Sequence, residues 1–472
     1  MSDRPFAGAA LRALVEAGLE RSAGEATPAL DDGEGAIPFD RLIRRAWIDA
    51  APEALEGRSL LLLTRRPLSA AVALCALDGV ARRLAICPPD LQRENLARVI
   101  ADAEADAVVF DGEAPDALPA GVAAFSICAT PEGLEHPLPA LRQSTEWALF
   151  TSGTTGAPKM VVHTLAGLTG AIAPGASAPA EQIVWGTFYD IRRYGGLQML
   201  LRALIGGHAM QLTGPHEPMS AFLPRLAAAG VTHLSGTPSH WRSALMHSGF
   251  EALSPRYVRL SGEIADQPIL DRLAARFPAA AVGHAYASTE AGVGFEVNDG
   301  LEGFPAAFLD RPGPVEMRVV DGTLRIRSPR AASGYLGEAA PVLADDDGFV
   351  DTGDLVERRG ERLYFMGRAS GVINVGGLKV HPAEVEAAVN RCEGVRMSLV
   401  AGRKSPIMGS IVAAKIVLVD PEQGLGERGL AMREAILARC RAALAPHKVP
   451  ASITFVEDLP MTAGGKVERR HA

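Results

Sequence analysis

Residues 151–159 read Thr-Ser-Gly-Thr-Thr-Gly-Ala-Pro-Lys and directly follow the apolar run 147–150. Small residues allow backbone N–H groups to crowd around phosphate oxygens, and the hydroxyls add donors. Lys159 supplies a positive charge for the β- and γ-phosphates of a nucleotide. The spacing is not that of a Walker A loop, since no Ser or Thr follows the lysine. A short Gly/Thr loop is more often a plain surface turn, but nine such residues after a strand predict a triphosphate site. Its members are Thr151, Ser152, Gly153, Thr154, Thr155, Gly156 and Lys159.

Segments typical of strands and helices alternate before this loop. Strands are expected at residues 59–64, 84–87 and 107–110, and helices at 68–78 and 91–104. Such alternation with short connections predicts a parallel sheet covered by helices on both faces. Residues 112–143 show no sustained period and predict a loop with one short strand at most.

The alternation of strands and helices continues after the loop, and the pattern changes at residue 314 and again beyond residue 371. Strands are expected at 148–150, 160–163 and 231–235, and helices at 221–229 and 265–276. From residue 314 the pattern is that of β-hairpins, with strands at 315–320, 323–326, 355–358 and 362–366. Beyond residue 371 a compact mixture follows, with strands at 372–375, 397–401, 411–419 and 452–456 and helices at 382–391 and 429–442.

These patterns predict an α/β chain of two domains. A large N-terminal domain, residues 1–366, is expected to layer parallel and mixed sheets with helices and to carry a β-hairpin subdomain. Residues 367–371 are expected to be a hinge, and residues 372–472 a small, mobile α+β domain of about a hundred residues.

Further polar segments follow the first loop in a fixed order. They read Ser-Gly-Glu at 261–263, Tyr-Ala-Ser-Thr-Glu at 286–290, Asp-Thr-Gly-Asp-Leu at 351–355, Gly-Arg at 367–368 and Leu-Pro-Met-Thr-Ala-Gly-Gly-Lys-Val at 459–467. Together with residues 151–159 they make the chain resemble the acyl-adenylate-forming superfamily over essentially its whole length. That superfamily includes acyl- and aryl-CoA synthetases, adenylation domains of nonribosomal peptide synthetases, and firefly luciferase.

The resemblance implies a nucleotide site that binds ATP and Mg²⁺. By it, Tyr286 stacks on adenine, Thr289 donates to the α-phosphate and Glu290 holds Mg²⁺, which neutralises charge on the leaving pyrophosphate. Gly262 and Glu263 belong to a loop beside the adenine and the acyl pocket. Asp354 accepts hydrogen bonds from the ribose hydroxyls, and Arg368 adds a donor there. The alternative for residues 286–290 alone is a helix N-cap, and an isolated segment 351–355 would more often be a turn aspartate.

The resemblance also implies that Lys466, from the C-terminal loop, bridges the substrate carboxylate and the α-phosphate. An isolated terminal lysine would usually be a solvated charge. Because the same site must then admit a thiol, the C-terminal domain is expected to rotate about the hinge between the two steps. Ser370 stands where the family usually carries Asp or Lys, which puts the hinge's polar contacts in doubt. Gly376 and Gly377 are expected to line the tunnel for the thiol-bearing arm of CoA, although a loop-to-helix connection is equally compatible.

Residues 185–196 are expected to line the acid pocket, with Trp185, Tyr189, Asp190, Arg192 and Gly236 as its candidates. A count without gaps puts Arg192 where CoA synthetases carry a His, which would suit an acid with a second anionic or polar group. A gapped alignment instead makes Tyr189-Asp190 resemble the Phe-Asp pair that binds an amino acid's ammonium. A buried ion pair between Asp190 and Arg193 with no substrate role is the alternative.

Net charge, apolar stretches and cysteine spacing narrow the class of protein. The net charge of −8 disfavours a general nucleic-acid binder, which needs a basic face. No apolar stretch approaches the roughly 18 residues needed to span a membrane. Five scattered cysteines without a paired spacing are typical of reduced thiols, and no secretory signal is visible. A cytoplasmic location is therefore expected.

These features together predict an ATP-dependent enzyme that activates a small carboxylic acid as acyl-AMP and transfers it to CoA. A stand-alone enzyme that loads a separate carrier protein is the nearest alternative. A kinase or ATPase is disfavoured by the absent Walker spacing. An inactive homologue that serves as a binding protein is disfavoured by Lys159, Glu290, Asp354 and Lys466.

Overall fold

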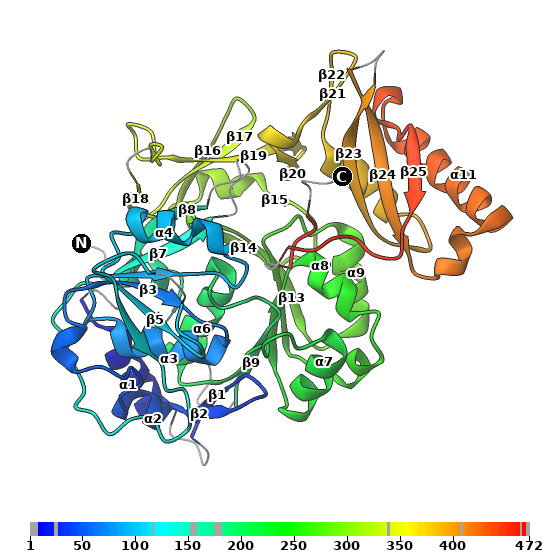
Figure 1. Cartoon of the computed structure of the whole chain (residues 1–472). Coiled ribbons are helices and arrows are strands. Elements are labelled where there is room, and N and C mark those ends of the chain that lie inside the picture. Colours follow the sequence, from blue (N-terminus) through cyan, green and yellow to red (C-terminus); the bar gives the residue numbers. More distant parts are fainter. Residues whose placement is uncertain are drawn as a thin grey trace.

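The computed structural model describes residues 8–22, 27–115, 118–151, 158–173, 182–337, 340–405, 409–462 and 465–468. Two large sheets layered with helices form the N-terminal part, and a smaller domain lies beside them at the upper right of Figure 1. The predicted α/β class and the small α+β domain are confirmed. No helix in the described parts of the chain is long and apolar enough to cross a membrane.

A seven-stranded sheet is built from the segments that alternate before the first loop. Its strands β3 to β7 run parallel, whereas β8 and β18 add antiparallel edges. In spatial order the strands are β18 (Gly334–Tyr335), β8 (Lys159–Thr164), β7 (Glu146–Thr151), β4 (Arg83–Ile86), β3 (Ser59–Leu63), β5 (Ala107–Phe110) and β6 (Ala123–Ser126). Among the described residues of 112–143, β6 is the single strand, which agrees with the prediction.

An eight-stranded sheet follows, in which β9 to β13 and β1 are parallel where they pair with one another. In spatial order its strands are β14 (Gly292–Val297), β13 (Ala281–Ser288), β12 (Tyr257–Ser261), β11 (His233–Gly236), β9 (Val184–Thr187), β10 (Ala209–Gln211), β1 (Ala29–Asp31) and β2 (Ala36–Pro38). Strands β13 and β14 form an antiparallel pair at its edge.

Helices fill the space between the two sheets and cover their outer faces. The apolar core between the sheets takes residues from α1 (Leu11–Arg21), α2 (Phe39–Arg44), α3 (Pro67–Leu77), α5 (Leu165–Thr169) and α6 (Tyr194–Gly206). The other face of the eight-stranded sheet packs on α7 (Met219–Ala228), α8 (Pro238–Ala244) and α9 (Gln267–Arg276). Helix α3 is apolar all round because it is buried on nearly every side.

The predicted β-hairpins form a five-stranded antiparallel sheet, coloured yellow-green to yellow in Figure 1. Its order is β15 (Phe304–Pro305), β20 (Arg362–Arg368), β19 (Val350–Arg359), β17 (Thr323–Arg327) and β16 (Glu316–Val320).

The C-terminal domain has a core of its own. Strands β23 (Val395–Ser405), β24 (Gly409–Leu418) and β25 (Ser452–Phe455) form one sheet, and β21 (Ile373–Val375) and β22 (Leu378–Val380) form a hairpin. Helices α10 (Pro382–Asn390) and α11 (Gly426–Ala443) complete it. Short 3₁₀ turns lie at Pro52–Ala54, Arg93–Asn95, Ser248–Ala252, Ala306–Asp310, Ala369–Gly371, Pro421–Gly424 and Pro446–Lys448.

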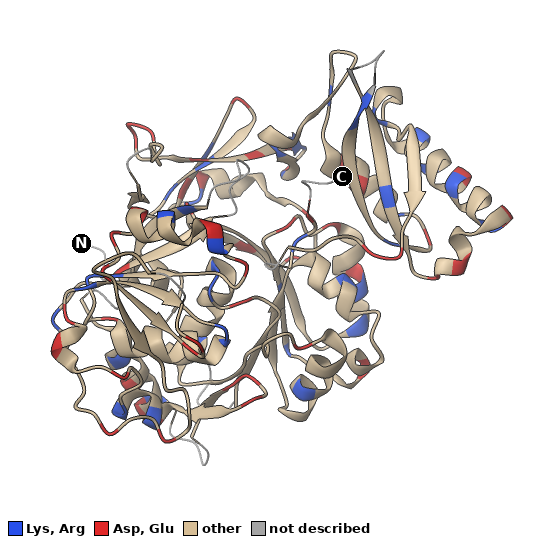
Figure 2. Ribbon diagram, viewed as in Figure 1, with Lys and Arg blue, Asp and Glu red and all other residues tan. Residues whose placement is uncertain are grey.

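One expected helix is shorter than predicted, and several elements were not predicted. The helix expected at 91–104 is a 3₁₀ turn followed by α4 (Leu96–Asp102). The sequence patterns gave no indication of α6 or of strands β12 to β14. In the view of Figure 2, basic and acidic residues are interspersed over both domains.

Candidate active site

The ends of the phosphate-loop hairpin lie beside Glu290. Thr151 and Lys159 face each other as the last pair of β7 and β8, whereas Ser152, Gly153, Thr154, Thr155 and Gly156 lie outside the described residues. The ammonium of Lys159 lies 6.0 Å from the ring centre of Tyr335, and the Tyr335 hydroxyl donates to Oε1 of Glu290 at 3.3 Å. Tyr335 is held there because its strand, β18, pairs with β8. A cation and a carboxylate from distant segments are thereby brought around one tyrosine.

The turn that carries Thr289 and Glu290 is fixed by its backbone. It connects β13 to β14, and the carbonyl of Thr289 accepts a hydrogen bond from Nε2 of His163 at 2.7 Å. Burial lowers the pKa of His163 to about 4, so the imidazole is neutral at pH 7. The backbone N–H of Ala332 donates to the carbonyl of Glu290 at 2.9 Å. Both side chains of the turn are partly exposed.

Tyr286 and Asp354 form the other end of the cleft. The Tyr286 ring stacks with Phe365 at 5.1 Å between centroids and with Phe295 at 5.6 Å. Its hydroxyl donates to Oδ2 of Asp354 at 2.6 Å, and Nε of Arg368 bonds Oδ1 at 2.8 Å. Burial, followed by the Asp354 carboxylate, raises the pKa of Tyr286. A carboxylate has about four acceptor positions, so Asp354 keeps capacity for two hydroxyl donors.

Lys466 reaches this cleft from the C-terminal domain. A Cβ built on Gly262, which has φ +83°, would lie 3.3 Å from Cε of Lys466. Desolvation lowers the pKa of the ammonium, and the carboxylates of Glu263 and Asp354 raise it. Part of the Lys466 side chain remains open to solvent, and the two carboxylates favour the charged form of the ammonium.

The loop around Lys466 is anchored to the N-terminal domain on both sides. Oγ1 of Thr237 donates to the carbonyl of Gly465 at 2.6 Å, and the backbone N–H of Val467 donates to Oε1 of Glu263 at 3.1 Å. Gly465 has φ +69°, and a Cβ there would lie 1.7 Å from the His240 ring. No other residue type fits this close approach, because both the backbone angle and the space require glycine.

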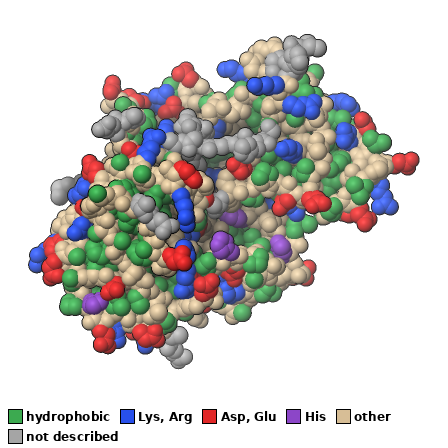
Figure 3. All heavy atoms as spheres, in the orientation of Figure 1, with side chains coloured by type: hydrophobic (Ala, Val, Ile, Leu, Met, Phe, Trp, Pro, Cys, Tyr) green, Lys and Arg blue, Asp and Glu red, His purple; other side chains and the backbone are tan. Residues whose placement is uncertain are grey.

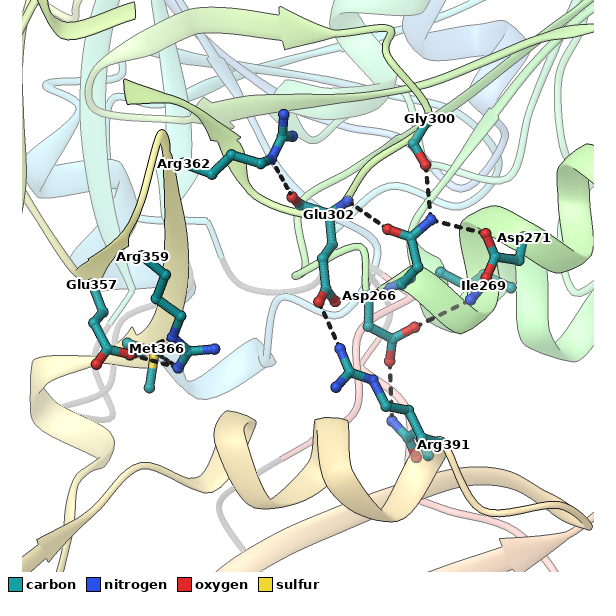
Figure 4. Close-up of polar contacts among 12 residues, drawn as sticks. Asp266, Ile269, Asp271, Gly300, Glu302, Glu357, Arg359, Arg362, Met366 and Arg391 are labelled. Carbon is teal, nitrogen blue, oxygen red and sulfur yellow. Dashed lines mark hydrogen bonds and ion pairs between the residues drawn. The ribbon is translucent and has the colours of Figure 1, made fainter. Parts of the chain in front are cut away.

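A second set of contacts joins the two domains near α10 (Figure 4). Arg391 pairs with Glu302 at 2.6 Å, and the Asn390 amide lies 3.4 Å from Oδ2 of Asp266. Arg391 is partly exposed, so this ion pair is a weak, separable contact. In Figure 3 histidine side chains gather near the hollow below the C-terminal domain.

Two of the expected acid-pocket residues neutralise each other. Asp190 makes a two-oxygen ion pair with Arg192, with distances of 2.6 and 2.8 Å. Arg192 also donates to the backbone carbonyls of Thr64 and Arg65. Arg193 pairs with Asp90 at 2.5 Å, so the alternative of an Asp190–Arg193 ion pair is wrong in its partner. Neither Asp190 nor Arg192 presents an uncompensated charge to an acid.

The other three pocket candidates are buried. Tyr189 donates to the backbone carbonyl of Ser261 at 2.9 Å, and Trp185 packs against His233 and Tyr257. Gly236 faces Phe188, whose ring would lie 2.6 Å from a Cβ built there.

The hinge and tunnel candidates lie outside this cleft's hydrogen-bond network. Ser370 is an exposed residue of the turn Ala369–Gly371, between β20 and β21. Gly376 and Gly377, with φ +57° and +90°, form the tip of the β21–β22 hairpin. The N–H of Gly377 donates to Oδ1 of Asn374 at 2.9 Å.

Three residues of the site were missed in the sequence. Tyr335, His163 and Phe365 position Glu290, Thr289 and Tyr286, respectively. None stands in a motif, and each contacts its partner only through the fold. For Tyr335 and His163, a place on strands next to the phosphate loop is the signal that could have suggested a role.

The model of the AMP-binding enzyme family matches residues 56–336 of this chain, more than half of its length. The chain belongs to the AMP-binding enzyme family. The model of the AMP-binding enzyme C-terminal domain matches residues 384–466, which include Lys466. The resemblance drawn from the motifs is thereby confirmed, and with it the expectation of an AMP-forming ligase at the level of the family.

Individual relatives agree with this family. The 2-succinylbenzoate–CoA ligase of Listeria monocytogenes is 27% identical over 400 residues, which are 80% of each chain. A substituted-propanoyl:CoA ligase of Mycobacterium tuberculosis is 30% identical over 342 residues, 68% of this chain and 64% of the relative. Among solved structures, the anthranilate CoA ligase AuaEII in complex with anthranoyl-AMP superposes with a TM-score of 0.77 at 19% identity, covering 97% of this chain and 95% of that one.

Proposed function

We propose that this AMP-binding enzyme adenylates a small carboxylic acid with ATP and transfers the acyl group to the thiol of CoA. The observation that carries the proposal is the position of Lys466. It crosses from the C-terminal domain to Gly262 and is close enough for electrostatic coupling to Asp354. A cation at that place can bind the acid's carboxylate and the α-phosphate together.

In the first step a carboxylate oxygen of the acid attacks the α-phosphorus, and the bond to the β-phosphate bridge oxygen breaks. Pyrophosphate leaves and acyl-AMP forms. Lys466 stabilises the negative charge that builds up on the α-phosphate, and Thr289 donates to the same group. Lys159, with residues 151–156, holds the β- and γ-phosphates. Asp354, Arg368 and Tyr286 hold the nucleoside, beside the loop of Gly262 and Glu263.

Glu290 fits a Mg²⁺ ion that arrives with ATP. Mg²⁺ is usually bound through one or two carboxylates plus substrate phosphates and water. Glu290 offers one partly exposed carboxylate, and the described residues contain no group of three metal-ligating side chains. A single carboxylate suits an ion that is also bound by the phosphates of ATP better than an ion that the protein holds by itself. When bound, Mg²⁺ would neutralise charge on the pyrophosphate as it leaves.

In the second step the thiol sulfur attacks the acyl carbonyl carbon, the bond to AMP breaks, and a thioester forms as the thiol proton is released. We propose that the C-terminal domain turns about Ser370 first, which removes Lys466 and brings Gly376 and Gly377 to the thiol arm. The few contacts that hold the domains together, such as Arg391–Glu302, support such a turn.

CoA is the favoured acceptor because the relatives reported above are CoA ligases. We place the reaction in the cytoplasm, since all five cysteines are free thiols.

Acid-dependent exchange of labelled pyrophosphate into ATP, measured across a panel of acids, tests the proposal. We expect exchange with a subset of acids and no release of ADP. ADP release would indicate a kinase, and silence with every acid would favour a binding protein. Adding CoA, or a carrier protein, to an active acid then decides the acceptor: free thioester with CoA is expected, and acylation of the carrier alone would overturn that part.

A further inference from the structure

On the face of the eight-stranded sheet that looks toward α6, several polar residues interrupt the apolar core. Parallel sheets covered on both faces are normally apolar throughout. Here two rows of paired residues cross the sheet on this face. One row is Thr187, Ser235, Arg259 and Gly283, and the next is Ser261, Ala285 and Glu296. The intervening residues Leu234, Val258 and Leu260 belong to the apolar core on the other face, as expected for such a sheet.

Helix α6 lies over this face and presents polar atoms without partners. Tyr194, Gln198 and Arg202 are four residues apart, so they share one face of the helix. The Gln198 Oε1 and Arg202 Nε atoms have no hydrogen-bond partner, and the Tyr194 hydroxyl approaches the backbone of Val293 without a bond of regular geometry. Tyr194 and Gln198 are only 5% and 3% exposed. Buried polar atoms are nearly always bonded, so this cluster has unused capacity to bind a polar group.

On the sheet face that carries Thr187 and Arg259, two further buried side-chain atoms have no hydrogen-bond partner. Nε1 of Trp185 on β9 and Oγ of Ser235 on β11 are also buried without a partner. The Trp185 ring contacts Tyr257, which interacts with Arg259. Unpartnered atoms therefore come from the helix and from the sheet wall beneath it.

The cluster carries an excess of positive charge. Arg259, which is 5% exposed, pairs with Glu296, and Arg202 lies 3.6 Å from the same carboxylate. Among the described residues, Glu296 is the one carboxylate paired with either guanidinium. Burial and then the charge of Arg259 lower the pKa of Arg202. An unbalanced buried cation is costly, so the site favours an additional anion.

The cluster is placed at a defined distance from the reactive end. Arg259 and Ser261 are two residues apart on the same face of β12, which corresponds to about 7 Å, and Gly262 at Lys466 is one residue further. Arg259 thus lies about 7–10 Å along β12 from the residue that Lys466 approaches, which is the separation that an extended acid would span.

We propose that the acid activated here carries a second anionic group, which Arg259, Arg202 and the Tyr194 hydroxyl bind. This inference rests on the proposed function and names the substrate class of the same site. The second group is a carboxylate or another acidic oxygen group at the far end of an extended skeleton. This second group neutralises the positive charge of Arg259 and Arg202 that Glu296 does not balance.

Matched pairs of acids test this substrate class. Straight-chain dicarboxylic acids of increasing length, and terephthalate, are compared with the monocarboxylic acids of the same skeleton by pyrophosphate exchange. We expect kcat/KM to be roughly 10–100-fold higher for the preferred dianionic acid, as charge-assisted hydrogen bonds imply. Equilibrium binding of the same acids, without ATP, is measured by calorimetry as a second readout.

Two variants and a matched control locate the effect. Tyr194→Phe removes a hydroxyl without a regular bond, so the thermal unfolding temperature should stay constant while KM for the dianionic acid rises about 3–10-fold. Arg202→Met should raise that KM at least about tenfold and leave KM for ATP unchanged. Arg272→Met, on the exposed side of α9 beyond the opposite face, should change neither constant.

The outcomes separate the two proposals. Exchange with mono- and dianionic acids at equal efficiency would overturn the inference and leave the adenylation proposal intact. No exchange with any acid would overturn the adenylation proposal, and the binding data would then decide the inference alone. Binding of the dianionic acids that is no tighter than that of their partners would overturn it.

Discussion

The carboxylate of Glu263 accepts a hydrogen bond from the backbone N–H of Val467 across the boundary between the two domains, at 3.1 Å. Its other oxygen accepts from the N–H of Ser239 at 3.0 Å, inside the N-terminal domain. One side chain therefore ties the loop of the proposed catalytic lysine to the acid and nucleotide cleft. We infer that Glu263 positions Lys466 for adenylation and has no such task once the domain has turned.

Replacing Glu263 by Ala should slow the adenylation half-reaction about 10–100-fold, since a hydrogen bond to a charged group is worth roughly 1.5–3 kcal/mol. Thioester formation from preformed acyl-AMP should change little. Single-turnover assays of each half-reaction measure the two effects. Glu361→Ala, at a side chain that is 94% exposed, is the control and should leave both rates unchanged. An equal loss in both half-reactions would argue against a role limited to the adenylation arrangement.

Asp354→Asn should raise KM for ATP about 10–30-fold, because the amide loses one of the charge-assisted bonds that organise Tyr286 and Arg368. KM for the acid should stay within about twofold. Steady-state kinetics with each substrate varied in turn measure the difference. Asp351→Asn, three residues earlier on β19, is the matched control because its side chain is 49% exposed. A rise in the acid's KM of the same size would contradict a nucleoside role for Asp354.

The alkaline limit of adenylation should be set by Lys466. Desolvation lowers the pKa of this ammonium below the ordinary 10.5, so the charged form is lost at a lower pH than for a free lysine. Lys466→Arg should extend the alkaline limb to higher pH, whatever its absolute rate, because a guanidinium stays protonated. The pH profile of pyrophosphate exchange shows this, with the exposed Lys404→Arg as control. Identical alkaline limbs in wild type and Lys466→Arg would assign the limit to another group.

Asp78 should make the fold more stable in mild acid. Burial raises the pKa of its carboxyl from 3.8 to about 6, although the Leu11 N–H and the Trp147 indole both donate to it. The folded chain therefore holds this proton more tightly than the unfolded chain, and the contribution to stability is lost as the pH rises through about 6. At about pH 5, one unit below the folded pKa, it amounts to about 1.4 kcal/mol relative to pH 8.

Urea unfolding of the wild type and of Asp78→Asn at both pH values isolates this contribution. The wild type should gain about 1.4 kcal/mol more than the variant on going from about pH 8 to about pH 5. A smaller gain in the wild type than in the variant would show that the buried carboxyl prefers its charged form.

The sequence predicted those parts of the fold in which local pattern and tertiary setting agree. Strand β5 spans residues 107–110 as expected. The hairpins of the five-stranded antiparallel sheet fall within a few residues of their predicted places. Helix α6 was missed because ten of its thirteen residues are buried and glycines stand near both ends, so it lacks a solvent face. Strand β12 alternates polar with apolar residues, but its polar side faces the interior between β12 and α6.

The site was predictable where one short segment carries its chemistry. Glu290, Asp354 and Lys466 were predicted because each stands in a motif. Tyr335, which bonds Glu290, and Thr237, which bonds the carbonyl of Gly465, come from other elements. The pairing of Asp190 with Arg192 could not be read from spacing. Arg193 is also close enough to Asp190 in the sequence to be its partner. The cluster of Arg259, Glu296 and Arg202 could not be predicted, because these residues meet only when β12, β14 and α6 pack together.

The two half-reactions of Lys466→Ala test the central claim most directly. We expect pyrophosphate exchange to fall at least about 10²–10³-fold, as loss of a positioned charge in the transition state implies. Thioester formation from preformed acyl-AMP and CoA should remain within a few-fold of the wild type. Retained exchange, or an equal loss of both half-reactions, would contradict an enzyme in which this lysine serves adenylation alone.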